Sequence, residues 1–157
     1  MKGQVWSLDF AVSVTIFLMV LVPFLLVFGY IVDQNSERTV LDDMEVSALS
    51  ISDSLVRAAG VPQDWNATTV ELVGLAYTEN VLDEGKMVLF DSLSYDKLKG
   101  VMSKGYDFYI KISDLNGTVY IEKGSLPART TIVPVERYAV YRNRVVKLQL
   151  YLWSGAE

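Results

Sequence analysis

The 157-residue sequence predicts an α+β fold: a long N-terminal helix packed against a C-terminal antiparallel β-sheet head domain with short helices. Three observations predict this fold. An uncharged apolar run covers Phe10 to Val32, and a helical stripe of apolar residues follows it without Pro or Gly up to Ala59. Apolar and polar residues then alternate along much of 106–153, which is typical of strands with one buried face.

The run from Phe10 to Val32 is long enough as a helix, roughly 33 Å, to cross a bilayer. Pro23 lies in its middle and predicts a kink or a local loosening, which membrane helices tolerate. Lys2 precedes the run and acidic residues follow it, so we expect a single-pass membrane protein with a cytoplasmic N-terminus and the C-terminal domain outside. A secretory signal peptide is the alternative, but no small-x-small cleavage site follows the run.

The segment 33–59 predicts an amphipathic helix that continues the apolar run into the head. Gly60 and Pro62 then supply a stop signal. One continuous helix from about Ser7 to Ala59 is therefore expected, and its second half must be covered by a domain. The alternative is a flexible break near Asp33–Asn35. The apolar stripe consists of Val40, Leu41, Met44, Ala48, Leu49, Ile51, Leu55 and Val56.

The remaining residues, 60–157, predict a globular α+β head. We expect a strand at 70–77, two short helices broken near Ser94, and a hairpin over 106–123 whose Asn116-Gly117 pair suits a type I′ turn. Two further strands should turn near Arg142-Asn143. The resulting sheet of about four or five strands would cover the helical stripe with its apolar face. That face includes Val146, Leu148, Leu150 and Leu152.

The amino-acid composition argues against several classes of function. The net charge is −5 without a Lys/Arg cluster, so nothing indicates nucleic-acid binding. Cys and His are both absent, which removes disulfides, thiolate nucleophiles, imidazole bases and most transition-metal sites. The carboxylate pairs Asp42-Asp43 and Asp83-Glu84 are therefore interpreted as solvated surface. We expect no enzymatic activity, no cofactor and no metal; Asp114 to Gly117 begins like a calcium loop but lacks the later acidic ligands.

Two kinds of surface site stand out. Asn66-Ala67-Thr68 and Asn116-Gly117-Thr118 fit the N-glycosylation acceptor pattern, which makes Asn66 and Asn116 candidate modification sites. Four aromatic residues are predicted to point away from the core on hairpin strands. They either pack under the helices expected at 84–103 or form a contact patch for another molecule. These residues are Tyr109, Tyr120, Tyr151 and Trp153.

A long helix, apolar and then amphipathic, followed by a sheet resembles the type IV pilins. The start of the chain is more specific. Lys2-Gly3-Gln4, followed by Ser7 and Asp9, resembles the class III signal peptide of archaeal prepilins and archaellins. Pro23 resembles the helix-breaking proline of many pilins. Later stretches, GVPQDW and VLDEGKMVLFDSLSYDKLKG, look like those of archaeal pilin-like proteins with α+β heads.

The resemblance implies a structural subunit, similar to a minor pilin, of an archaeal cell-surface filament. A prepilin peptidase would process the leader region, 1–9, by cleaving between Gly3 and Gln4. The helix 10–32 would first lie in the membrane and then form the filament core with other pilin subunits, identical or different. The usual pattern after the cut is Gln-x-Ser-x-Glu, whereas here it is Gln-x-x-Ser-x-Asp. Cleavage after Gln4 would restore the position of Asp9 but would put an unusual residue before the bond.

Asp9 has two interpretations. The resemblance implies that its carboxylate attracts the N-terminal amine of a neighbouring subunit and thereby sets the axial register. Locally, Ser7 would cap the helix and Asp9 in the first turn would complement the helix dipole. For the whole chain, the alternative function is a solitary, single-span membrane-anchored extracellular binding domain that does not polymerise.

Overall fold

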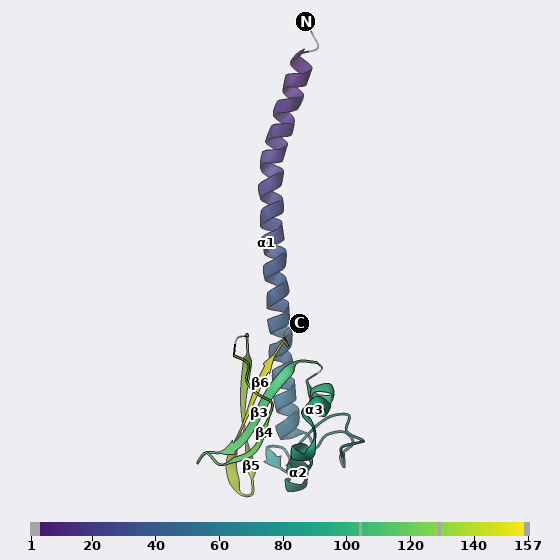
Figure 1. Cartoon of the computed structure of the whole chain (residues 1–157), viewed down its shortest axis with the longest axis vertical. Coiled ribbons are helices and arrows are strands. Elements are labelled where there is room, and N and C mark those ends of the chain that lie inside the picture. The colour runs from purple at the N-terminus through teal and green to yellow at the C-terminus, as the bar shows by residue number, and fades with distance from the viewer. Residues whose placement is uncertain (1–3, 104, 129, 156–157) are drawn as a thin grey trace. The chain divides into compact units, whose positions relative to one another are not determined.

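The computed structural model describes residues 4–103, 105–128 and 130–155, and it describes only the backbone at 4–7 and 32–38. Within these residues it confirms the α+β fold, with a long N-terminal helix, two short helices and a six-stranded sheet (Figure 1). The elements are α1 (Gln4–Arg57), β1 (Ala76–Thr78), β2 (Val81–Leu82), α2 (Glu84–Ser92), α3 (Tyr95–Met102), β3 (Asp107–Asp114), β4 (Val119–Lys123), β5 (Val133–Tyr141) and β6 (Arg144–Trp153).

The chain divides into two compact units, Met1–Leu41 and Asp42–Glu157. Among the described residues, the first unit consists of residues 4–41 of α1, which include the apolar run 10–32. The second contains residues 42–57 of α1, the two short helices and the sheet. Helix α1 includes Pro23 and also residues 33–35, where the alternative interpretation places a flexible break. It begins at Gln4 and ends at Arg57, close to the predicted Ser7 and Ala59.

The sheet has the order β1-β2-β5-β6-β3-β4. Its centre is a long antiparallel β5–β6 hairpin, paired from Val133 with Leu152 to Tyr141 with Arg144. Strand β3 pairs antiparallel with β6, and β4 pairs antiparallel with β3. The sheet has more strands than the sequence predicts because β1 and β2 are too short to show a periodic pattern. A single parallel contact, Val81 with Val140, joins β2 to β5.

The core of the second unit lies between the sheet and the amphipathic end of α1. The predicted inward face of β6 is fully buried, and Phe108, Ile110 and Ile112 of β3 are buried beside it. The helical stripe supplies Met44, Ala48, Ile51, Leu55 and Val56, all buried. Arg137 of β5 donates a hydrogen bond to Asp53 of α1 at 3.0 Å. The predicted covering of the helix by the apolar face of the sheet is thus confirmed for these five residues, whereas Val40 and Leu49 of the predicted stripe are exposed.

The strand predicted over 70–77 is wrong for most of its length, since only Ala76 and Tyr77 lie in β1. The backbone of this segment instead caps the end of α1. The N–H of Leu75 donates to the carbonyl of Leu55 at 3.0 Å, and the N–H of Ala76 donates to that of Ala58 at 3.0 Å. Helix ends leave carbonyls without intrahelical donors, and here a buried apolar segment satisfies them.

The turn expected at Asn116-Gly117 is not type I′. Gly117 has φ +93°, but Asn116 is not among the described residues with positive φ, and a type I′ turn needs both. The N–H of Asp114 donates to the carbonyl of Thr118 at 2.9 Å and closes a loop of three residues, 115–117, within which the N–H of Gly117 donates to the carbonyl of Asp114. The Asp114 carboxylate accepts N–H groups of Asn116 and Thr118 and favours this longer loop.

The two-residue turn with both φ values positive lies between β5 and β6. Arg142 has φ +48° and Asn143 has φ +61°, and Tyr141 pairs with Arg144 across the turn. The predicted turn at this position is therefore confirmed.

Candidate functional site

The apolar half of α1 is the first candidate site. Residues Leu8–Ile31 reach a mean hydropathy of 2.8 in their most apolar window, and none of that window is buried by the rest of the chain. The hydroxyl of Thr15 donates to the carbonyl of Ala11 at 2.8 Å, so this polar group is satisfied within the helix. By length and composition, the segment suits a membrane span or a signal sequence.

Pro23 lies inside this segment, and α1 continues through it. Because proline lacks an N–H, the carbonyl of Met19 has no helical donor four residues later. Phe24 and Phe28 stack one turn apart with ring centroids 6.2 Å apart. Pro23 therefore removes one backbone hydrogen bond from the helix but does not end it.

Asp9 lies in the second turn of α1, not in the first. The helix begins at Gln4, and its first turn contains no acidic residue. Ser7 is consequently inside the helix and cannot be its N-cap, so the local interpretation of Ser7 and Asp9 is wrong. The effect of the helix dipole falls off within the first turn. Asp9 is exposed and has neither a hydrogen bond nor an ion pair with any described side chain.

The proposed cleavage point adjoins the start of the described chain. Gly3 lies outside the described residues, and Gln4 is described by its backbone alone, as the first residue of α1. Cleavage at this bond therefore stays a prediction.

The four aromatic residues do not form one patch. Tyr109 and Tyr151 lie side by side on the sheet face opposite the core, with ring centroids 5.8 Å apart. The Tyr109 hydroxyl donates to Glu122 at 2.8 Å. Burial is the main cause that raises the pKa of Tyr109 to about 12, and this hydrogen bond adds to it. Trp153, on the same strand as Tyr151, is only 8% exposed and is not available as a contact surface.

Tyr120 lies elsewhere because of an irregularity in the pairing of β3 with β4. Ile112 pairs with Ile121 but Ser113 pairs with Val119, which leaves Tyr120 as an extra residue. Its ring meets Tyr141 edge-on at 5.1 Å, and both line a small cavity beside α2. For Tyr120, the packing alternative is therefore the observed one.

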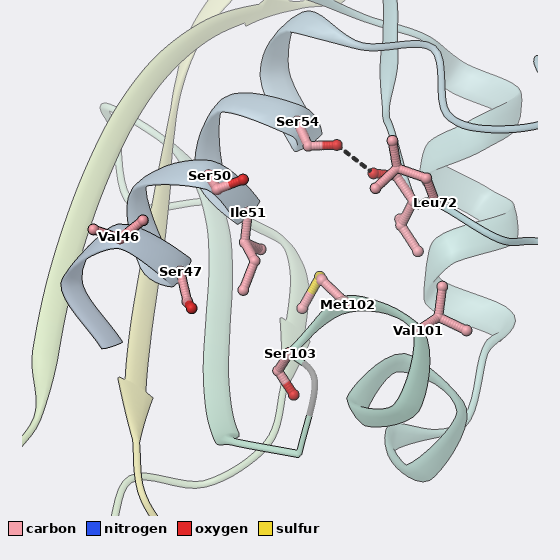
Figure 2. A pocket seen from close by; sticks show the side chains of 10 residues that line it. Val46, Ser47, Ser50, Ile51, Ser54, Leu72, Val101, Met102 and Ser103 are labelled. Carbon is pink, nitrogen blue, oxygen red and sulfur yellow. Dashed lines mark hydrogen bonds between the residues drawn. The ribbon is translucent and has the colours of Figure 1, made fainter. Parts of the chain in front are cut away.

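A cavity of about 240 Å³ was not predicted from the sequence (Figure 2). It lies between α1, residues 72–73 and the end of α3. Among the described residues, its lining is aliphatic apart from one thioether and several hydroxyls and includes no acid or base. The hydroxyl of Ser54 donates to the carbonyl of Val73 at 3.0 Å (Figure 2). Three serines of α1, Ser47, Ser50 and Ser54, line the cavity, and their spacing in the sequence could have indicated it. The apolar stripe beside them made that spacing hard to recognise.

A cluster of hydrogen-bonded side chains that joins α3 to the start of β3 was also not predicted from the sequence. Asp107 accepts hydrogen bonds from Lys99 at 2.5 Å and from the Tyr95 hydroxyl at 2.9 Å. The Tyr95 hydroxyl oxygen accepts the N–H of Phe108 at 3.1 Å. Hydrogen bonding with Lys99 lowers the pKa of Asp107. The three side chains satisfy one another, so the cluster fixes α3 against the sheet.

The fold and these residues together define an α+β head domain that follows an N-terminal apolar helix of membrane-span length. This architecture is consistent with a pilin-like or a membrane-anchored protein. Comparison of the chain with protein-family models, with curated proteins and with solved structures finds no match. Its function is therefore inferred from its own residues.

Proposed function

We propose that this chain is a pilin-like structural subunit, similar to a minor pilin, of an archaeal cell-surface filament. One observation carries the proposal. Leu8–Ile31 is apolar and unburied, yet the same helix, α1, supplies core residues to the head domain. Such a segment suits both lipid and a bundle of identical helices. It could be stored in the membrane and later moved into a filament at little cost, because one apolar environment replaces another.

The proposal includes removal of the leader by a prepilin peptidase between Gly3 and Gln4. Before cleavage, the N-terminus would be cytoplasmic and the head outside. Intact-mass measurement of protein from native membranes tests this step. We expect a mature chain that begins at Gln4, and we expect Gly3→Val to block cleavage because a bulky side chain obstructs the peptidase. Native protein that uniformly retains Met1 or Lys2 contradicts the proposal.

Within the filament, Asp9 would pair with the N-terminal amine of a neighbouring subunit. Its exposed carboxylate lies beyond the first turn and has no hydrogen bond or ion pair with any described side chain, so neither capping nor a described partner explains it. A charge beside hydrocarbon is costly, and such residues are usually functional. Because desolvation offsets much of the attraction, the pair would set register more than stability.

Asp9→Asn and Asp9→Glu form the decisive comparison. Asn keeps the size of the side chain but removes its charge, so we expect normal membrane insertion and reduced incorporation into filaments. Glu keeps the charge and should be tolerated better. Both variants are quantified in membrane and sheared-filament fractions. Equal incorporation of the Asp and Asn forms would remove the proposed role of Asp9.

The second candidate is a solitary membrane-anchored binding domain, and we propose no catalytic role in either case. The open cavity beside α1 favours this alternative, because a ligand pocket needs such a concave, mostly apolar lining. If the mature chain never appears in sheared filaments and remains in membranes as a monomer, the anchored domain replaces the filament subunit as the best explanation.

A further inference from the structure

We infer that Asn66 is an N-glycosylation site of this chain and that Asn116, although it also lies in an acceptor triplet, stays unmodified in the folded protein. The inference rests on the proposed function in one respect only: the head must lie outside the membrane. The two triplets, Asn66-Ala67-Thr68 and Asn116-Gly117-Thr118, are alike in sequence. They differ in how the fold holds them.

The reaction sets the requirements. The amide nitrogen of Asn attacks the anomeric carbon of a glycan carried on a lipid phosphate. The bond from that carbon to the phosphate oxygen breaks, the lipid phosphate leaves with the electron pair, and the amide nitrogen loses one proton. The acceptor must therefore present a free amide nitrogen and an accessible hydroxyl residue at the third position.

The Asn66 side chain meets these requirements. Its amide oxygen accepts three hydrogen bonds, from the Thr68 N–H at 2.9 Å, the Thr69 N–H at 3.2 Å and the Thr68 hydroxyl at 2.7 Å. All three donors act on the oxygen, and the amide nitrogen has no partner in the described part of the chain. These hydrogen bonds hold the amide group by its oxygen and, within the described residues, leave both N–H groups of the amide nitrogen free for a transferase to engage.

The surrounding loop presents this side chain to solvent. Residues 66–69 are all exposed, whereas Trp65 and Val70 on either side are 2% and 6% exposed. The indole N–H of Trp65 donates to the carbonyl of Gly74 at 3.0 Å, which anchors the start of the loop. The backbone hydrogen bonds of Asn66 are local, from its N–H to the Thr69 hydroxyl at 3.1 Å and from the Val70 N–H to its carbonyl at 3.1 Å, so binding of a transferase here breaks no contact between strands.

The Asn116 triplet is held differently, although it is also exposed. The N–H of Thr118 donates to the buried Asp114 carboxylate at 2.8 Å, and the N–H of Asp114 donates to the carbonyl of Thr118 at 2.9 Å. The N–H of Gly117 donates to the carbonyl of Asp114 at 3.2 Å. Within the described residues, the Thr118 hydroxyl makes no hydrogen bond to Asn116. A transferase would have to open this hairpin end to bind the triplet.

The experiment uses the full chain with a flexible C-terminal tag that carries its own Asn-Ala-Thr triplet. The host is one whose membrane transferase glycosylates this tag on exported control proteins. Peptide mass mapping measures glycan occupancy at each triplet. We expect glycan on the tag and on Asn66, and none on Asn116. Thr68→Val and Asn66→Gln should abolish occupancy at residue 66, while Thr69→Ala and Asn116→Gln should leave it unchanged.

The tag separates the two ways in which the inference can fail. Glycan on the tag with a bare Asn66, or equal occupancy of Asn66 and Asn116, overturns the inference while leaving the outward head intact. A bare tag places the head on the other side of the membrane, which overturns the inference together with the topology of the proposed function.

Discussion

At the scale of single residues, Gly74 shows how one position determines the path of the chain after α1. A Cβ atom at Gly74 would lie 2.3 Å from the carbonyl oxygen of Ala58 and 2.4 Å from the backbone nitrogen of Gly60. Both are backbone atoms, so neither can move aside as a flexible side chain would. Only glycine allows the segment that caps α1 to approach the end of the helix this closely.

Gly74→Ala is therefore expected to destabilise the head by about 1–3 kcal/mol or more, the usual cost of overpacking a well-packed site. Thermal unfolding of the full chain in detergent micelles, followed by near-ultraviolet circular dichroism, measures the effect. Gly100→Ala is the matched control. Gly100 lies within α3 with open space around its Cβ position, so alanine should stabilise by about 0.5–1 kcal/mol. Equal melting of the two variants would contradict the close approach at Gly74.

Tyr109 gives a pH prediction. Its pKa is raised to about 12 in the folded chain, against about 10 when unfolded. The folded state thus holds the proton more tightly, and this contribution to stability is complete below pH 10 and is lost as the pH rises through 12. We expect the stability advantage of the native chain over Tyr109→Phe to shrink between about pH 10 and 12. Denaturant unfolding at several pH values measures this difference, and a constant difference would contradict the prediction.

At the scale of elements, β6 shows how period-two alternation separates two environments. Leu148 is fully buried on the inner face, whereas Val145 is 47% exposed on the outer face. An unpaired carboxylate is costly in a core and cheap in water. Leu148→Asp should therefore cost several kcal/mol, on the order of 3–5, while Val145→Asp should cost about 0.5 or less. Unfolding of both variants by denaturant tests the orientation of the strand, and similar midpoints would contradict it.

The loops that follow β3 and β5 show where local sequence signals are weaker. Asn-Gly is the usual type I′ pair, yet the two-residue turn with two positive φ values is formed by Arg142 and Asn143. The Asp114 carboxylate determines the conformation of the loop that contains Asn116-Gly117, because it accepts hydrogen bonds from the N–H groups of Asn116 and Thr118. A side chain that competes for backbone donors thus overrides the dipeptide preference.

At the scale of the whole molecule, the division into two compact units predicts that the head can be separated from the apolar helix. Residues 34–157 should be soluble and monomeric and should unfold cooperatively, because the core lies within 42–157 and deletion removes the apolar segment. Light scattering after size exclusion and a thermal scan measure these properties. Residues 60–157 are the control: they lack Met44 and Leu55 of the core and should aggregate. A soluble, cooperatively folded 60–157 fragment would show that α1 is dispensable to the core.

The sequence by itself determined the elements that carry a long periodic signal. The apolar run, the helical stripe ending near Gly60 and the alternation along β3, β5 and β6 predicted the fold class, because one buried face imposes a repeat on local sequence. The sequence alone also located the apolar segment, Asp9 and both acceptor triplets. The roles of these features stay proposals.

Only the tertiary structure decided what the short or irregular segments do. The segment 70–75 is apolar enough for a strand, but the N–H of Leu75 meets the carbonyl of Leu55 at the end of α1, and the N–H groups of Glu71 and Leu72 meet the carbonyl of Val61. Tyr120 faces α2 because of an irregular pairing, and Trp153 is buried. The cavity beside α1 likewise needs three separate segments to form it. Such outcomes depend on partners that are distant in sequence, and no local pattern identifies those partners.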